Sequence, residues 1–261
     1  MSQIYSFSQA GCTTDKSVWE RCGKRGQRAL ELAEMKLPVV PGFILDARLC
    51  ARIERTPIKN VIQKGLEHIE KEIGRKYGDA ENPLLIKVVC SSNLSLPIYP
   101  TVFNIGLSPK TMSGFARMMG EEAAWFEYCY LLRTAGIKIF DIPEAQFVEI
   151  EKKHDRSVEG QKACAEEMRQ LVGADNIPED PVDQLEVIIK QAVKRYYDPD
   201  LDEDDNVAVM VQGMVFGNLT PESSVGMYYT RNIITGEDKM QGSYLKNAYT
   251  LDRSGQDIHG L

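Results

Sequence analysis

Carboxylates at alternating positions mark the segment DPDLDEDDN, residues 198–206. That spacing could hold a divalent cation, because the first half of a calcium-binding loop supplies its ligands at every second position. Such a loop also requires glycine at its sixth position and glutamate at its twelfth, where this chain has Glu203 and Val209. We therefore interpret the segment as a solvated acidic linker, and the sequence predicts no metal-binding residue.

A short basic cluster, GKRG at residues 23–26, could place Lys24 and Arg25 beside a phosphate group at the start of a helix. A cluster of this size is more often a solvated surface, so it needs support from other motifs. The chain contains neither the phosphate-binding motif GxxxxGK followed by Ser or Thr nor the dinucleotide-binding motif GxGxxG. The CSS segment at residues 90–92 lacks the glycines that flank a catalytic serine. No catalytic residue is predicted.

Six cysteines and three histidines are scattered along the chain. They form no CxxC pair and no cluster with the spacing of zinc ligands. The N-terminal residues lack the basic and apolar regions of a signal peptide, so we expect the thiols to stay reduced in the cytoplasm. The cysteines that we predict to be free are Cys12, Cys22, Cys50, Cys90, Cys129 and Cys164.

The composition is that of an acidic globular protein. The 261 residues include 31 Lys and Arg against 38 Asp and Glu, which gives a net charge of −7. A general nucleic-acid-binding surface requires concentrated positive charge, so the balance argues against that class. No segment approaches the roughly 20 apolar residues of a membrane-spanning helix. We expect one large domain or two small ones, with no nucleic-acid or membrane partner.

The segments that would position the basic cluster begin with a helix over residues 24–36, which is rich in strong helix formers and limited by Pro38. A second helix is predicted to open at Pro57, with Thr56 as its N-cap. Its apolar residues keep helical spacing until Gly78-Asp79, where we expect it to close.

Strands are predicted where apolar runs lose helical spacing. Residues 84–90, LLIKVVC, indicate a buried strand, and residues 91–102 indicate a loop because they contain two prolines and no helical period. Further along the chain, residues 206–218 and 225–232 are strand candidates. A turn at 235–237 separates the latter from a third candidate, KMQGSYL.

The interval between these strands is helical almost throughout. Residues 108–197 show helical spacing that is interrupted at glycines and prolines, with Ser108 as an N-cap and Pro109 as the first helical residue. Strands and helices are segregated rather than alternating. The sequence therefore predicts an α+β fold rather than a doubly wound sheet.

Three segments, taken in order, resemble the N-terminal nucleotide-binding domain of pyruvate phosphate dikinase, an ATP-grasp-like module shared with phosphoenolpyruvate synthase. The first is GKRGQRALELAEMKLPVVPGF, residues 23–43, and the second is KYGDAENPLLIKVVCSSNLSLPIYPTVFNIGL, residues 76–107. The third combines VQGMVFGN, residues 211–218, with the later motifs TRN, TGE and GSYLKNA. Together these matches cover almost the whole chain.

The resemblance implies a two-lobed, ATP-grasp-like nucleotide-binding fold with a helical insert. Residues 24–107 would form the N-terminal lobe, residues 108–200 the helical segment, and residues 207–261 part of the C-terminal lobe. The residues that the resemblance assigns to the nucleotide site are Lys24, Arg25, Gln212, Met214, Val215 and Arg231. The two basic residues of the N-terminal lobe would face the phosphates, the next three would line the adenine, and the last belongs to the TRN motif.

The chain departs from the family pattern at several phosphate-binding positions. The family's loop arginine aligns with Val89, and the glycine-rich loop after it corresponds to CSSNLSLPIYP, which has no glycine. An arginine pair aligns with Cys129 and Tyr130, and Gln256 replaces a glutamate, which weakens a Mg²⁺ site. The family's phosphohistidine domain and phosphoenolpyruvate-binding barrel do not follow in this sequence. We therefore expect ATP and Mg²⁺ to bind weakly or not at all.

These features favour a stand-alone, catalytically inactive dikinase-like domain with a binding or regulatory role. Its partner would be another protein or a second copy of this chain. The alternative is the ATP-binding subunit of a split dikinase or phosphoenolpyruvate synthase, completed by another chain that supplies the missing ligands. We expect a cytoplasmic location in both cases.

Overall fold

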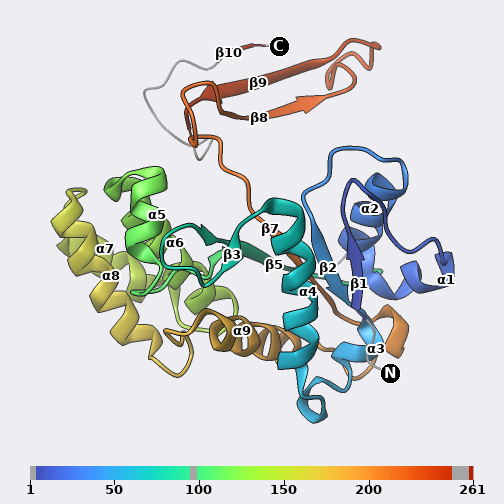
Figure 1. Cartoon of the computed structure of the whole chain (residues 1–261), viewed down its shortest axis with the longest axis horizontal. Helices are drawn as coiled ribbons and strands as arrows, with labels where there is room; N and C mark the ends of the chain where they lie inside the picture. The colour runs from blue at the N-terminus through green and yellow to red at the C-terminus, as the bar shows by residue number, and fades with distance from the viewer. Residues whose placement is uncertain (1–3, 95–98, 249–258, 261) are drawn as a thin grey trace. The chain divides into compact units, whose positions relative to one another are not determined.

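The computed structural model describes residues 4–94, 99–248 and 259–260 of the chain (Figure 1). It divides into two compact units, Met1–Met214 and Val215–Leu261. Each unit has its own antiparallel sheet, and the long helices belong to the first. The predicted mixed α+β class is therefore confirmed, and each unit is described by itself below.

A five-stranded antiparallel sheet forms the centre of the first unit, in the order β1-β2-β7-β5-β6. The central strand β7 comes from a part of the chain far from its neighbours (Figure 1). All six of its residues are buried, so it shows none of the alternation of a half-exposed strand. The strands are β1 (Ile4–Phe7), β2 (Gly42–Leu45), β5 (Ile86–Ser91), β6 (Thr101–Ile105) and β7 (Ala208–Gly213).

Helices α2 (Gly23–Glu34) and α4 (Ile58–Ile73) cover opposite faces of this sheet. Consecutive residues of a strand point to opposite faces, and Phe43 and Ile44 are consecutive on β2. The Ile44 side chain lies against α2, since a Cβ added at Gly26 would be 3.1 Å from its Cδ1 atom. The Phe43 ring lies against Gly65 of α4, where an added Cβ would overlap it.

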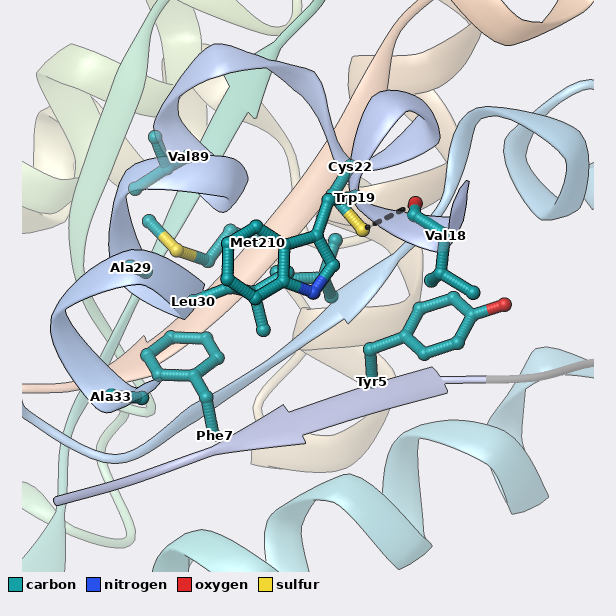
Figure 2. Packing of buried hydrophobic residues seen from close by; sticks show 11 residues of the cluster. Tyr5, Phe7, Val18, Trp19, Cys22, Ala29, Leu30, Ala33, Val89 and Met210 are labelled. Atoms are coloured by element: carbon teal, nitrogen blue, oxygen red, sulfur yellow. Dashed lines mark hydrogen bonds between the residues drawn. The ribbon is translucent and has the colours of Figure 1, made fainter. Parts of the chain in front are cut away.

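The face under α2 holds a compact apolar cluster (Figure 2). Leu30 and Ala33 of α2 pack there against Phe7 of β1, and the indole of Trp19 fills the space beside them. Apolar residues at helical spacing on α2 meet strand residues at a spacing of two, which is why this helix docks on the sheet. The cluster fixes where α2 begins, and with it the position of the basic residues in its first turn.

The interval 108–197 contains helices and no strand, as the sequence predicted. Helix α9 contacts β5, β6 and β7, and α6 contacts β6 and packs against α5 and α8. The remaining helices of the first unit are α1 (Lys16–Trp19), α3 (Ala47–Cys50), α5 (Met112–Met119), α6 (Glu121–Lys138), α7 (Glu144–Lys153), α8 (Val158–Val172) and α9 (Pro181–Tyr196). Short elements are η1 (Glu20–Cys22), η2 (Ile53–Arg55), η3 (Glu203–Asp205), β3 (Lys76–Tyr77) and β4 (Pro83–Leu84).

The predicted limits of α4 were wrong at both ends. Pro57 is the N-cap and makes no side-chain cap, while the hydroxyl of Thr56 instead donates to the carbonyl of Arg52 at 2.9 Å. The helix ends at Gly74, whose φ of 78° is the left-handed conformation that terminates many helices. A glycine earlier than the expected Gly78 therefore stops the helix.

Two further predictions between residues 91 and 112 were wrong. Residues 101–105 form strand β6 rather than a loop that continues through 102, because the edge of β5 pairs with them. Ser108 and Pro109 do not begin a helix, since α5 starts at Met112. The hydroxyl of Thr111 closes the intervening turn by accepting from the Ser108 amide at 3.0 Å.

The second unit contains a three-stranded antiparallel sheet in the order β10-β9-β8. Its strands are β8 (Ser224–Tyr229), β9 (Gln241–Lys246) and β10 (His259–Gly260). The turn predicted at residues 235–237 lies between β8 and β9, and Gly236 supplies a φ of 76° there. Most residues of β8 are exposed, so this strand contributes few buried side chains to the second unit.

All six cysteines lie in the described segments, and each is a free thiol in this structure. Burial raises the pKa of Cys22 and of Cys90 to about 12, so both thiols stay protonated at neutral pH. Among the residues that the structure describes, no helix is long and apolar enough to cross a membrane.

Candidate ligand-binding face of the sheet

The first turn of α2 is attached to the end of β5. The amide of Lys24 donates to the carbonyl of Ser92 at 2.9 Å, and the amide of Arg25 donates to the hydroxyl of Ser91 at 3.0 Å. Gly23 has a φ of 64°, and a Cβ there would lie 2.6 Å from the Ser91 carbonyl oxygen. These two amides of the helix start therefore bind protein oxygens and are not available to a phosphate.

The guanidinium of Arg25 lies over the junction between β5 and β6. Its Nη1 donates to the hydroxyl of Thr101 at 3.1 Å and lies 3.5 Å from the carbonyl oxygens of Cys90 and Pro100. The Arg25 residue is exposed, and it forms no ion pair with a carboxylate in the described part of the chain. One cation is thus fixed at this edge of the sheet without a neutralising partner.

Val89 occupies the position that the resemblance assigned to the family's loop arginine. Its side chain is 4% exposed and packs in the apolar cluster with Ala29 and Met210 (Figure 2). An ionised group could not stay at this position without large desolvation. The surroundings of position 89 are apolar and closely packed, so they accommodate the valine side chain and disfavour an arginine.

Lys87 is a residue of this face that the sequence analysis did not select. It lies two positions before Val89 on β5, so both side chains project from the same face. The register places Lys87 opposite Gln212 of β7 and Val89 opposite Met210. Lys87 is half-buried, and burial, followed by the nearby charge of Arg25, lowers its pKa. In the sequence, the only sign of this residue's role is that it is the single charged residue in the apolar run LLIKVVC.

Gln212 and Met214 lie next to the same strands. The side-chain amide of Gln212 donates to the Val40 carbonyl at 2.8 Å, which leaves this residue 7% exposed. The amide of Met214 donates to the Leu85 carbonyl at 3.0 Å, and its sulfur accepts from the Asn104 amide at 3.2 Å. Arg25, Gln212 and Met214 therefore all contact or belong to the five-stranded sheet, and Lys24 is exposed beside Arg25.

Val215 and Arg231, the other two residues selected from the sequence, belong to the second unit. Val215 is 73% exposed. Arg231 is exposed, and its guanidinium lies 3.8 Å from the Asp238 carboxylate and 3.5 Å from the Gly236 carbonyl oxygen. Both assignments to a nucleotide site stay predictions.

A buried amide and a carboxyl group meet between β6 and α6. Asn104 is fully buried with a φ of 63°, and its side-chain amide donates to the Glu127 carbonyl at 3.2 Å and also to the Glu127 carboxylate. Burial raises the pKa of Glu127 to about 7, although the bond from Asn104 opposes the shift. Protonation of Glu127 therefore takes place near neutral pH.

The positions that correspond to the family's arginine pair carry no charge. The thiol of Cys129 donates to the Gln161 carbonyl at 3.6 Å, and the ring of Tyr130 lies 6.3 Å from that of Phe103. Burial raises the pKa of the Cys129 thiol. Gln256 and residues 95–98 of the glycine-free loop lie outside the described residues.

The acidic segment 198–206 is bound to the rest of the first unit. Arg48 donates to both carboxylate oxygens of Asp204, at 2.6 and 2.7 Å. The Asn206 side chain accepts from the Asp198 amide at 3.1 Å and donates to the Asp198 carbonyl at 2.5 Å. This segment acts as a connection that leads into β7, and the described residues contain no group of side chains arranged to hold a metal ion.

No protein-family model matches the chain. It is 32% identical over 253 residues to "Pyruvate, phosphate dikinase" of Treponema pallidum, covering 92% of this chain and 28% of that protein. It is 28% identical over 286 residues to a chloroplastic pyruvate, phosphate dikinase of Zea mays, covering 98% of this chain and 30% of that protein. The corresponding protein of Rickettsia bellii is 28% identical over 284 residues, with coverages of 98% and 32%.

The chain is therefore homologous to a part of pyruvate, phosphate dikinase, which confirms the resemblance inferred from the sequence motifs. It spans about 30% of the length of these relatives.

Proposed function

We propose that this homologue of a segment of pyruvate, phosphate dikinase is an ATP-grasp-like domain with a binding or regulatory role that does not itself transfer phosphoryl groups. Its ligand face is the side of the five-stranded sheet that carries Arg25, Lys87 and Gln212. The domain holds its ligand or protein partner without activating a γ-phosphate. Under this proposal the protein is a pseudoenzyme.

The position of Val89 carries most of this proposal. Phosphoryl transfer depends on positioning and on neutralising charge around the transferred group. The position that corresponds to the family's loop arginine is a valine packed beneath α2 with Met210, and the adjacent amides of α2 bind Ser91 and Ser92. The loop arginine and two of the helix-start amides that could contact a phosphate at this corner are thereby unavailable, and Arg25 is the cation that stays there.

A second candidate function is the ATP-binding subunit of a split dikinase that another chain completes. The observation that favours it is Arg25, which stays at the start of α2 with its guanidinium at the β5–β6 junction. A partner could supply the missing phosphate and metal ligands next to this cation.

Transfer of label from γ-labelled ATP separates the two functions. The purified chain would be incubated with Mg²⁺ and labelled ATP, alone and with the part of the Treponema pallidum dikinase that this chain does not match. We expect no label on protein and no dikinase activity in either mixture. Activity in the mixed sample that disappears with Arg25→Ala would establish the split enzyme and refute the proposed function.

A further inference from the structure

We propose that strand β8 of the second unit is a docking surface for a second copy of this chain. The β8 strands of the two copies would pair antiparallel across a two-fold axis and join their three-stranded sheets into one. The inference goes beyond the proposed function, because β8 is not part of the five-stranded sheet that carries the ligand face.

Strand β8 has a free backbone edge. In the order β10-β9-β8 it has one neighbour, and six consecutive residue pairs join it to β9 without a register shift. The backbone groups of alternate residues in a strand point to its two sides, so half of those of β8 point away from β9. No strand in the described ranges 4–94, 99–248 and 259–260 pairs with them. A regular row of such groups is what an added strand binds.

This edge lacks the features by which proteins block pairing with another chain, which are charged side chains, prolines and bulges. The sequence SVGMYY contains no charge and no proline, and its pairing with β9 contains no bulge. Met227 and Tyr228 project from opposite faces of the strand, and they are 51% and 63% exposed. A paired β8 strand would cover part of this apolar surface, which lowers its free energy.

A second copy fits the edge because β8 is complementary in size to itself. Antiparallel strands related by a two-fold axis place one residue opposite its own copy. With Met227 at that position, Gly226 lies opposite Tyr228 of the second copy. Val225 lies opposite Tyr229 in the same register. An aromatic ring beside a glycine and an aromatic ring beside a β-branched side chain are favourable cross-strand pairs, and the symmetry forms each of them twice.

The charges that flank β8 favour the same arrangement. Glu222 precedes the strand and Arg231 follows it, and both residues are exposed. They are almost equally far from Met227 in sequence, so antiparallel pairing brings Glu222 of each copy next to Arg231 of the other. A parallel pair would place like charges together at both ends. Within one copy, Arg231 lies only 3.8 Å from the Asp238 carboxylate, and Glu222 forms no ion pair with a described residue.

Sedimentation equilibrium of the full chain tests the inference. We expect the mass to rise from the 29.4 kDa of one copy toward twice that value between about 1 and 100 μM, because a small interface binds weakly. Met227→Lys places two ammonium groups opposite one another at the axis, so we expect the dimer dissociation constant to rise at least tenfold. The control Ile234→Lys adds the same charge at an exposed apolar residue of the β8–β9 turn and should leave the constant unchanged.

A charge exchange keeps the test independent of the folding of Met227→Lys. Glu222→Arg alone should weaken the dimer several-fold, because it places like charges together at both ends of the paired strands. Adding Arg231→Glu to that variant should restore the affinity, since the exchanged charges are complementary again. Failure of the second substitution to restore the affinity would contradict the antiparallel arrangement.

Three other results would overturn the inference. They are a wild-type protein that stays monomeric at the highest concentration, an effect of Ile234→Lys as large as that of Met227→Lys, and a mass that rises beyond two copies. The last is decisive because a two-fold pair is closed. None of these measurements involves ATP, so labelled ATP can refute the proposed function while the β8 interface stands.

Discussion

The side-chain amide of Asn104 donates to the carboxyl group of Glu127, and this contact joins the edge strand β6 to α6. Asn104 is fully buried, and burial raises the pKa of Glu127 to about 7. A carboxyl group that prefers its neutral form inside the folded protein makes stability depend on pH across the physiological range.

Stability is expected to fall as pH rises from about 4.5 toward 7. In this interval the folded state retains a proton on Glu127 that the unfolded state has released, so raising the pH favours unfolding. The loss is complete above the folded pKa and amounts to at most about 3 kcal/mol. Chemical denaturation of wild-type protein and Glu127→Gln between pH 5 and pH 8 measures it. A slope that is equally steep in Glu127→Gln would contradict the assignment.

Gly23→Ala is expected to destabilise the protein by about 2 kcal/mol or more. The φ of 64° disfavours a side chain, and an added Cβ would lie 2.6 Å from the Ser91 carbonyl oxygen. The matched control is Gly173→Ala, where φ is 88° but nothing lies within 4 Å, so only the backbone cost applies. Equal losses in urea denaturation of the two variants would show that the contact with Ser91 contributes nothing.

Asp46 has two separable roles that a pair of variants can distinguish. Its carboxylate accepts from the Leu49 amide at 2.8 Å, capping α3, and from Arg21 Nε at 3.2 Å in a largely buried ion pair. Asp46→Asn retains a capping oxygen but leaves Arg21 without its counter-charge, while Asp46→Ala removes both.

We expect Asp46→Ala to cost more than Asp46→Asn by about 1 kcal/mol, the usual contribution of a helix cap. Thermal unfolding of both variants and wild-type protein gives the comparison. Identical melting temperatures for the two variants would show that the Asp46 side chain does not stabilise the protein by capping α3.

Restoring an arginine at position 89 is expected to destabilise the protein without restoring nucleotide binding. Val89 packs with Ala29 and Met210, so Val89→Arg buries a charge and overfills the cluster, at a cost of about 3 kcal/mol or more. Val89→Met is the apolar control for size. A folded Val89→Arg variant that binds MgATP at least a hundredfold more tightly than wild-type protein would contradict the interpretation of this position.

Local sequence patterns predicted the long elements of the fold because those patterns are dictated by burial on one face. Helix α2 and the helical interval after residue 108 follow a helical spacing of apolar residues, and β7 is an apolar run that only a central strand can bury. Strand β6 was missed because prolines dominate the sequence before it, whereas pairing with the edge of β5 decides its structure.

The candidate site was predicted only in part. Strand pairing in the sheet brings its residues together, and no local sequence motif contains them. Arg25, Gln212 and Met214 were selected by resemblance to a family. Lys87 has no motif of its own, and its importance comes from lying opposite Gln212 and beside the charge of Arg25. No local pattern could reveal that Val89 packs beneath α2, because the residues that bury it come from distant segments.

Calorimetric titration of the wild-type protein with MgATP tests the central claim most directly. Each charge-assisted phosphate contact contributes roughly 1.5–3 kcal/mol, so the absence of two such contacts lowers affinity by a factor of roughly a hundred to ten thousand. The account predicts a dissociation constant in the millimolar range or weaker, with the remaining affinity dependent on Arg25. A micromolar dissociation constant that Arg25→Ala abolishes would contradict it and would favour the split enzyme.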